Sequence, residues 1–342
     1  MRKNARSRGV TILDVAREAG VSPTTVSRVL NSRDHVRPDK RTRVLTAVTR
    51  LGYVVNQQAR SLAGGRSQVI GLLVHEVGVA YTGEIVRGIE EELAAAQYEL
   101  MLYTTHRRKT KESAYVATLT RGMTDGLLLL LPLNSQAYLE TLHQEGFPYV
   151  VIDYQGFDDF SPTVIAKNWQ AAFDATSYLI QLGHRRIGFI AGSPELSSAI
   201  QRLSGYKAAL EAHGIPYDPD LVANGDFQQA CGYQAANQLL ALAERPTAIF
   251  AANDMSAFGA MDAVRNRGLV IPDDISLVGF DDLPSAAAVR PSLTTVHQPL
   301  IEMGRVATQM LLEYIGDPAL RTRRIEFDTE LVIRESCCPP KR

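Results

Sequence analysis

The sequence has 342 residues, 45% of them hydrophobic and 21% charged, and this ordinary globular composition excludes a disordered, collagen-like or coiled-coil protein. Three cysteines, two of them adjacent, exclude a disulfide framework, and the longest apolar run, 126–133, is too short to span a bilayer. No apolar segment follows the basic N-terminus, so a secretory signal peptide is excluded and we expect a cytoplasmic protein without a membrane contact.

The net charge of −1 conceals an uneven distribution. Residues 1–66 contain 14 lysines and arginines against 4 acidic residues, whereas residues 67–342 contain 22 against 33. A basic head on an acidic body predicts that the head binds a polyanion. A solvated basic tail is the alternative, but the head also carries a regular helical pattern.

The first helix of the head is expected over 12–19. Thr11 is a candidate N-cap with Asp14 as its capping partner, and apolar residues then recur at helical spacing. Gly20 can adopt the positive φ that ends a helix. These signals predict a short helix that stops in a tight turn.

Two more helices follow the glycine turn. Ser22 can cap a helix over 24–30 with Pro23 at its first position, and a third helix is expected over 38–51. A short helix pair joined by a tight turn predicts a helix-turn-helix, whose second helix enters the major groove. There Arg28 can donate two hydrogen bonds to a guanine. A generic helical bundle is the alternative interpretation of these three helices. In the third helix, the side chains expected to face the core are those of Val44, Leu45 and Val48.

The run Thr11–Asn31, TILDVAREAGVSPTTVSRVLN, closely resembles the DNA-binding signature of the LacI/GalR family of bacterial transcription repressors. The run Leu51–Leu62 resembles the hinge of that family. The resemblance covers roughly residues 10–335 and includes further motifs in the family's order. These motifs are Gly88–Leu93, Asp125–Leu129, Leu179–Ile190, Ala252–Ala263 and Pro272–Pro299.

The segment between head and body is expected to be a hinge. Residues 56–62 can form a short helix, but seven residues are too few for a stable isolated one. The resemblance implies that it folds only with its dimer mate on cognate DNA, where Leu62 wedges into a base step of the minor groove. A plain flexible linker is the alternative. The residues expected to contact DNA are Thr11, Ser22, Pro23, Thr24, Thr25, Ser27, Arg28, Asn31, His35, Asn56, Ala59, Leu62 and Ala63.

From residue 69 onward, short apolar runs alternate with helical patterns, which predicts doubly wound parallel α/β sheets. About 270 residues are long for one such sheet, so two lobes are expected. The expected strands are 69–74, 98–104, 126–131, 149–153, 187–191, 247–251 and 275–280. The expected helices lie near 83–97, 109–122, 135–146, 169–183, 198–213, 228–243, 254–267 and 298–315.

The expected fold is α/β with an all-α head. It consists of a helix-turn-helix domain (1–52), a hinge helix and linker (53–67) and a two-lobe body (68–342). The resemblance implies that the body is of the periplasmic-binding-protein type, in which the chain crosses between lobes three times. We expect the crossings near 163–167, 293–297 and 325–329. Lobe one is then about 68–163 plus 297–326, and lobe two about 166–294 plus 329–335.

A ligand is expected between the lobes, at the carboxyl ends of strands. The resemblance implies that Arg202 and Asp281 are the most regular effector contacts. Asp254 is expected to be an N-cap instead, His184 a helix-end residue and not a metal ligand, and His75 and Glu76 face either the cleft or another protomer. The residues expected to bind the effector are Tyr81, Asp153, Tyr154, Arg202, Phe227, Asn253 and Asp281.

Two positions bear on the class of effector. Purine-responsive members of the family place a stacking phenylalanine where this chain has Thr82, and a second arginine where it has Leu196. These departures favour a neutral carbohydrate, either a monosaccharide or an oligosaccharide, because carboxylates, amides and aromatic rings suit sugars. A purine or nucleoside effector is the alternative.

No phosphate-loop, zinc-protease or hydrolase motif occurs, and the adjacent Asp281 and Asp282 point apart, so we expect no enzyme, no metal and no cofactor. A transport or chemotaxis sugar-binding protein is the alternative function, but it has no use for a basic head. The sequence therefore predicts a homodimeric repressor that binds a pseudo-palindromic double-stranded DNA operator. An effector that closes the cleft would lower operator affinity, although activator and corepressor logic stay open.

Overall fold

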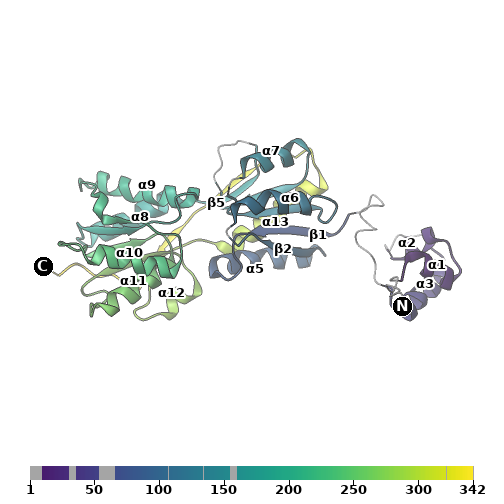
Figure 1. Cartoon of the computed structure of the whole chain (residues 1–342), viewed down its shortest axis with the longest axis horizontal. Coiled ribbons are helices and arrows are strands. Elements are labelled where there is room, and N and C mark those ends of the chain that lie inside the picture. The colour runs from purple at the N-terminus through teal and green to yellow at the C-terminus, as the bar shows by residue number, and fades with distance from the viewer. Residues whose placement is uncertain are drawn as a thin grey trace, which may run out of the picture. The chain divides into compact units, whose positions relative to one another are not determined.

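The computed structural model describes residues 10–30, 36–53, 66–106, 108–133, 135–154, 160–320 and 322–341 (Figure 1). The chain divides into two compact units, Met1–Ser67 and Gln68–Arg342. Within these described ranges, no helix is long and apolar enough to cross a membrane.

The first unit is a bundle of three short helices. One apolar face of each helix forms its core, in which Val15, Val26 and Val44 are completely buried. The prediction that Leu45 lies inside is wrong, because its side chain is 48% exposed. The buried face of its helix runs through Val44 and Ala47, and one residue turns a helix by about 100°. The helices are α1 (Ile12–Ala19), α2 (Pro23–Leu30) and α3 (Pro38–Leu51).

Both predicted caps of the head are present. The backbone N–H and the hydroxyl of Thr11 donate to the Asp14 carboxylate over 2.9 and 2.7 Å. Gly20 has φ +60°, and the N–H of Thr25 donates to Ser22 Oγ over 3.2 Å. These local contacts determine where α1 ends and where α2 begins.

The first lobe of the second unit is a six-stranded parallel sheet in the order β11-β5-β4-β3-β1-β2. Alternate strand residues face opposite helix layers, as a pleated strand requires: Leu128 packs toward α5 and α13, and Leu129 toward α6 and α7. The strands are β1 (Val69–Val74), β2 (Glu99–Thr104), β3 (Gly126–Leu130), β4 (Tyr149–Ile152), β5 (Thr163–Ala166) and β11 (Arg324–Phe327). The helices are α5 (Ala80–Ala95), α6 (Glu112–Leu119) after a 3₁₀ turn (Lys109–Lys111), α7 (Gln136–Gln144) and α13 (Leu300–Gly316).

The second lobe repeats this plan with the order β12-β10-β9-β8-β6-β7, in which only the β10–β12 pair is antiparallel. Phe250 packs in the core on the side of α8 and α9, and Ile249 in the core on the side of α10 and α11. The strands are β6 (Ile187–Ile190), β7 (Val222–Ala223), β8 (Ala248–Ala251), β9 (Ser276–Asp281), β10 (Thr294–His297) and β12 (Glu330–Val332). The helices are α8 (Asn168–Gln181), α9 (Ser197–Ala212), a 3₁₀ turn (Pro219–Leu221), α10 (Gln229–Leu240), α11 (Asp254–Asn266) and α12 (Pro284–Ala288).

The chain passes between the two sheets three times. It does so after β5, between β10 and α13, and between β11 and β12. The predicted crossing at 293–297 is wrong by a few residues, because 294–297 forms β10 of the second sheet and the passage follows at Gln298–Pro299. The first predicted crossing overlaps β5, which belongs to the first sheet.

Helices α5 and α13 touch backbone to backbone. A Cβ at Gly88 on α5 would overlap the carbonyl oxygen of Ile301, and a Cβ at Gly304 on α13 would overlap that of Ile85. Glycine at both positions therefore permits this close approach, which no larger residue would allow without moving a helix.

Candidate functional site

The exposed face of α2 is the candidate DNA-reading surface of the first unit. Thr24 and Arg28 are exposed, and Thr25 and Ser27 are half-buried, whereas Val26 and Val29 hold the helix to the core. Polar side chains and a guanidinium on one solvated face can reach base edges and phosphates.

Other predicted DNA contacts divide into two groups. The hydroxyls of Thr11 and Ser22 serve as helix caps in the free head, while Ser22 and Pro23 are exposed at the start of α2. The remaining predicted positions lie outside the described residues. They are Asn31, His35, Asn56, Ala59, Leu62 and Ala63.

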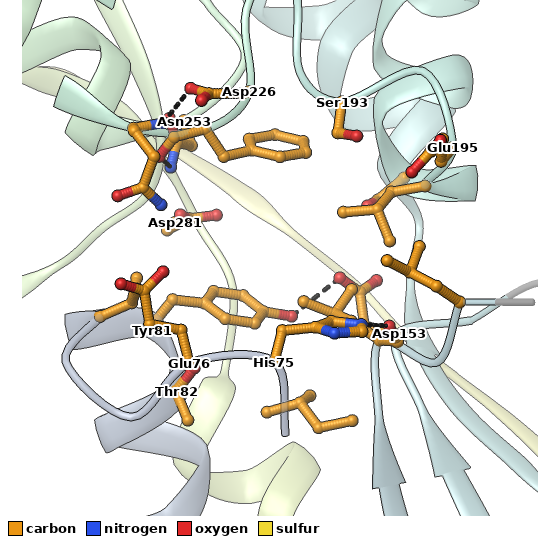
Figure 2. Close-up of a pocket in the computed structure, with 18 of the residues that line it drawn as sticks. His75, Glu76, Tyr81, Thr82, Asp153, Ser193, Glu195, Asp226, Asn253 and Asp281 are labelled. Atoms are coloured by element: carbon orange, nitrogen blue, oxygen red, sulfur yellow. Dashed lines mark hydrogen bonds between the residues drawn. The ribbon is translucent and has the colours of Figure 1, made fainter. Parts of the chain in front are cut away.

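A cavity of about 240 Å³ lies between the two lobes of the second unit (Figure 2). Six of the seven residues predicted to bind the effector line it: Tyr81, Asp153, Arg202, Phe227, Asn253 and Asp281. Tyr154 does not line it, and packs against the core beneath α6 and α7 instead. The left-handed backbone at Asp153 (φ +54°) turns the chain there, and Tyr154 then packs into the core instead of the cavity.

The wall from the first lobe carries a hydrogen-bonded pair. Tyr81, in the first turn of α5, donates its hydroxyl to Asp153 Oδ2 over 2.8 Å, and both side chains are buried. Burial raises the pKa of the Tyr81 phenol well above its usual value, and the Asp153 carboxylate raises it further. The phenol therefore remains a neutral donor at neutral pH.

The wall from the second lobe is built around Arg202 of α9, which is 1% exposed. Its Nε donates to Asn168 Oδ1 over 2.8 Å, and its Nη1 donates to the carbonyl of Ala252 over 2.5 Å and lies 3.5 Å from Asp281 Oδ1. The guanidinium stacks on Phe280 with its carbon 3.6 Å from the ring centroid. Packing and hydrogen bonds thus hold this cation in one orientation.

Asp281 ends β9 on the same wall. Its Oδ1 accepts a hydrogen bond of 2.8 Å from Gln298, which lies on the passage from β10 to α13. Burial raises the pKa of Asp281 to about 7, against the opposing effects of Arg202 and Gln298, and the carboxylate of Asp153 raises it as well. The two lobes therefore interact electrostatically across the cavity.

Four cavity residues have a left-handed backbone. Leu131, Asp153, Phe227 and Asp281 have φ between +51° and +111°, and each follows or ends a strand. Such conformations are costly for residues with a side chain and occur mainly where function requires a particular orientation. Gly192 faces the Phe227 ring, which a Cβ there would overlap.

Asn253, not Asp254, is the N-cap of α11, so the prediction for Asp254 is wrong by one residue. Asn253 Oδ1 accepts from the N–H of Ser256 over 2.9 Å, and its Nδ2 donates to the carbonyl of Phe227. Asp254 is completely buried and accepts hydrogen bonds from Thr295 and from the N–H of Leu283. It supports the cavity wall from behind.

Sequence reasoning left several cavity residues unassigned. His75 and Glu76 line the cavity, which agrees with the cleft alternative for these two positions. His75 contacts the hydroxyl of Thr105 and the carbonyl of Leu131. Other residues from the segments after β6 and β7, including the first turn of α9, were missed, although the strand-end signal that indicated Phe227 applies to these segments as well. They are Ser193, Glu195, Leu196, Ser198, Asp226 and Gln228.

Two further predicted residues lie away from the cavity. His184 is buried after α8 and contacts Thr247, Ser276 and the carbonyl of Cys338. Asp282 faces away from the cavity and pairs with Arg334 over 2.6 Å. Within the described parts of the chain, no group of His, Cys, Asp or Glu could hold a metal ion.

The chain is similar to known regulators over nearly its whole length. Residues 11–56 match the family described as bacterial regulatory proteins, lacI family, and residues 176–337 match the periplasmic binding protein-like domain. The HTH-type transcriptional repressor PurR of Photobacterium profundum is 36% identical over 327 residues, which cover 95% of this chain and 98% of that repressor.

Two solved structures show the same architecture. The transcriptional regulator CelR–cellobiose complex matches with a TM-score of 0.73 at 33% identity, covering 96% of this chain and 99% of that chain. The lac repressor dimer bound to operator and the anti-inducer ONPF matches with a TM-score of 0.85 at 28% identity, covering 97% of this chain and 100% of that chain.

Proposed function

This chain belongs to the lacI family of bacterial transcriptional repressors, and we propose that a small carbohydrate bound between its lobes controls its affinity for DNA. The family consists of DNA-binding repressors that respond to small-molecule effectors and are not enzymes. The carbohydrate, a homodimeric state and a pseudo-palindromic operator are the parts that we propose.

One observation carries the proposal. Two polar pairs line the cavity: Tyr81 is hydrogen-bonded to Asp153 in the first lobe, and Arg202 is ion-paired with Asp281 in the second. Tyr81, Asp153 and Asp281 are labelled in Figure 2. Carboxylates accept hydrogen bonds from sugar hydroxyls, and a guanidinium donates to their oxygens. Phe227 supplies an aromatic surface for the apolar face of a sugar ring.

The position of these pairs supports control of DNA binding. A ligand that bonds to both walls favours the arrangement of lobes in which both pairs reach it. Such a ligand binds the two arrangements with different affinities, which is the condition for shifting DNA affinity. On this proposal the α2 residues Thr24, Thr25, Ser27 and Arg28 read the operator.

The similarity to the cellobiose-bound regulator supports a carbohydrate, whereas the similarity to the repressor PurR favours a purine as the second candidate. The cavity itself argues for the first. Thr82 and Leu196 both line it, so neither an aromatic ring nor a second guanidinium stands at those two positions to hold a purine.

A binding screen tests the proposal. The purified full-length protein is heated with mono- and disaccharides, and separately with adenine, guanine and hypoxanthine, and each hit is then added to a protein–operator complex. A sugar that raises the Tm and changes operator affinity is the expected result. A purine base that does so while no sugar does would replace the proposal by its alternative.

A further inference from the structure

The cavity is lined by more acidic than basic side chains. Among its described lining residues, the acidic ones are Glu76, Asp153, Glu195, Asp226 and Asp281, and the basic ones are His75 and Arg202 (Figure 2). Even with Asp281 left out because burial raises its pKa to about 7, four carboxyls line the cavity against one guanidinium, so the charge of the described lining is predominantly negative.

The Nε and Nη1 groups of Arg202 are already engaged by the protein. Its guanidinium already donates to Asn168 Oδ1 and to the carbonyl of Ala252, and it pairs with Asp281 at 3.5 Å. Its face is covered by Phe280. An acidic ligand would have to compete with Asp281 for this cation.

The cavity also disfavours negative charge on two of its own groups. Burial first, and then the carboxylate of Asp153, raise the pKa of Asp281 to about 7, while Arg202 and Gln298 oppose that rise. Burial and the carboxylates of Asp153 and Asp281 likewise raise the pKa of Tyr81. Burial is the largest cause of both shifts, so a ligand that brings a negative charge into the cavity pays for lost hydration as well, and the Asp153 carboxylate adds repulsion.

Resting on the carbohydrate effector proposed above, we propose that the cavity selects by charge: it binds sugars that are uncharged or carry a protonated amine, and it rejects sugars that carry a phosphate or a carboxylate. A phosphate monoester brings about −1.5 to −2 charges at neutral pH. It would lose its hydration and face several carboxylates without a free cation to compensate.

Matched sugar sets test this selection on the full-length protein by calorimetry. Each set contains a parent sugar, its amino derivative and its acidic derivatives, for example glucose, glucosamine, glucose 6-phosphate and glucuronate, with ribose and ribose 5-phosphate as a second set. Cellobiose is included as a disaccharide. The acidic derivatives should bind at least about tenfold more weakly than the parent or amino form that binds best.

An acidic derivative that binds as tightly as its parent, or better, overturns the charge selection and leaves the carbohydrate effector standing. If no sugar of any charge binds, the carbohydrate effector fails and this inference fails with it. The two failures are therefore distinguishable.

Charge-neutral variants separate electrostatic from steric rejection. Asp226→Asn and Glu195→Gln each remove one cavity charge with little change in shape, and each should reduce the ratio of the two Kd values, acidic derivative over parent, by about fivefold. Glu211→Gln is the matched control, because this exposed carboxylate on α9 lies outside the cavity lining. A ratio that stays constant in both cavity variants, or that moves equally in the control, would show that shape and not charge excludes the acidic sugars.

Discussion

The two candidate binding surfaces of this chain are built in opposite ways. On α2, the exposed Arg28 is free of the core, and buried residues such as Val26 keep the helix in place. In the cavity, Arg202 and Asp281 are themselves buried, and their contacts connect several elements of the second lobe. The head can therefore lose a DNA contact and keep its fold, whereas the cavity cannot lose Arg202 or Asp281 without losing stability.

The largest expected effect is on Arg202. Arg202→Met should lower the free energy of unfolding by about 3–5 kcal/mol, because it leaves the buried acceptors Asn168 Oδ1 and the Ala252 carbonyl without their donor and removes the cation that pairs with Asp281. Urea unfolding of the wild type and the variant measures this difference. The matched control is Arg87→Met, which breaks an exposed ion pair with Glu91 within α5 and should cost less than about 1 kcal/mol.

A double variant sharpens the same comparison. Adding Asp281→Asn to Arg202→Met removes the uncompensated charge and should restore part of the lost stability. Equal and small losses in Arg202→Met and Arg87→Met would mean that the cavity wall is not a structural network, and the contrast with the head would disappear.

Arg28 is the corresponding test in the head. Arg28→Ala should weaken binding to the cognate operator by about 1–3 kcal/mol and relax the preference at one base position, with less than about 0.5 kcal/mol lost from the free energy of unfolding. Binding to a set of operators with single base changes measures both quantities. Arg28→Lys keeps the charge and should lose the base preference while keeping most non-specific affinity. An unchanged base preference in Arg28→Ala would contradict a role in reading bases.

The pH dependence of stability tests the buried cavity wall through Asp281. Since burial raises the pKa of Asp281 to about 7, the folded state holds a proton that the unfolded state has released. The contribution of this group is therefore fully present below about pH 4 and is lost as the pH rises through about 7.

Relative to Asp281→Asn, the wild type should thus lose about 1–2 kcal/mol of unfolding free energy between about pH 5.5 and 7. Urea unfolding at several pH values measures the difference. Asp273→Asn, at an exposed position paired loosely with Lys341, is the control and should show no such trend. Parallel curves for the wild type and Asp281→Asn would refute the raised pKa.

The smallest expected effect is on the cap of α1. Asp14→Ala removes the acceptor of two hydrogen bonds from Thr11 and should cost about 1 kcal/mol of head stability. Thermal unfolding followed by circular dichroism measures it. Arg17→Ala, which removes only an exposed contact to Asp14, should cost clearly less. Equal losses would mean that the exposed charge and not the cap stabilises this turn.

The head was predictable from sequence because its signals are local. Asp14, Gly20 and Pro23 mark helix ends through contacts within three or four residues, so the three helices agree closely with prediction. Leu45 was misplaced because an apolar residue at the border of a helix face is not buried by its hydrophobicity alone.

The body was predictable where burial is strong on both faces of a strand. Central strands such as β3 and β8 read as apolar runs, but β5 and β11 are only four residues long, and β11 pairs with a strand that lies about 160 residues earlier in the sequence (Arg324 opposite Thr163). β10 was mistaken for part of a crossing because Thr294 and Thr295 are polar in composition, although both are completely buried.

The sequence predicted that residues at strand ends would line the cavity, but it did not predict every individual side chain that does so. Parallel strands bring their carboxyl ends together, which correctly indicated that residues such as Asp153 and Asp281 would line a common space. Which of two neighbouring side chains faces that space depends on the local backbone, and this decides against Tyr154. Asp226 and Glu195 lie in segments that follow strands, so the same strand-end signal indicated their neighbourhood, but which of their side chains face the cavity depends on the packed fold.

The glycine contacts between α5 and α13 have a mechanical consequence. α5 starts next to Tyr81, and α13 starts just after Gln298, so the first turns of both helices are tied to cavity carboxylates. Because the backbones touch at Gly88 and Gly304, the two helices cannot slide past each other and should move together as one rigid body. A ligand that displaces either Tyr81 or Gln298 by a fraction of an ångström at the cavity would therefore carry the far ends of both helices with it.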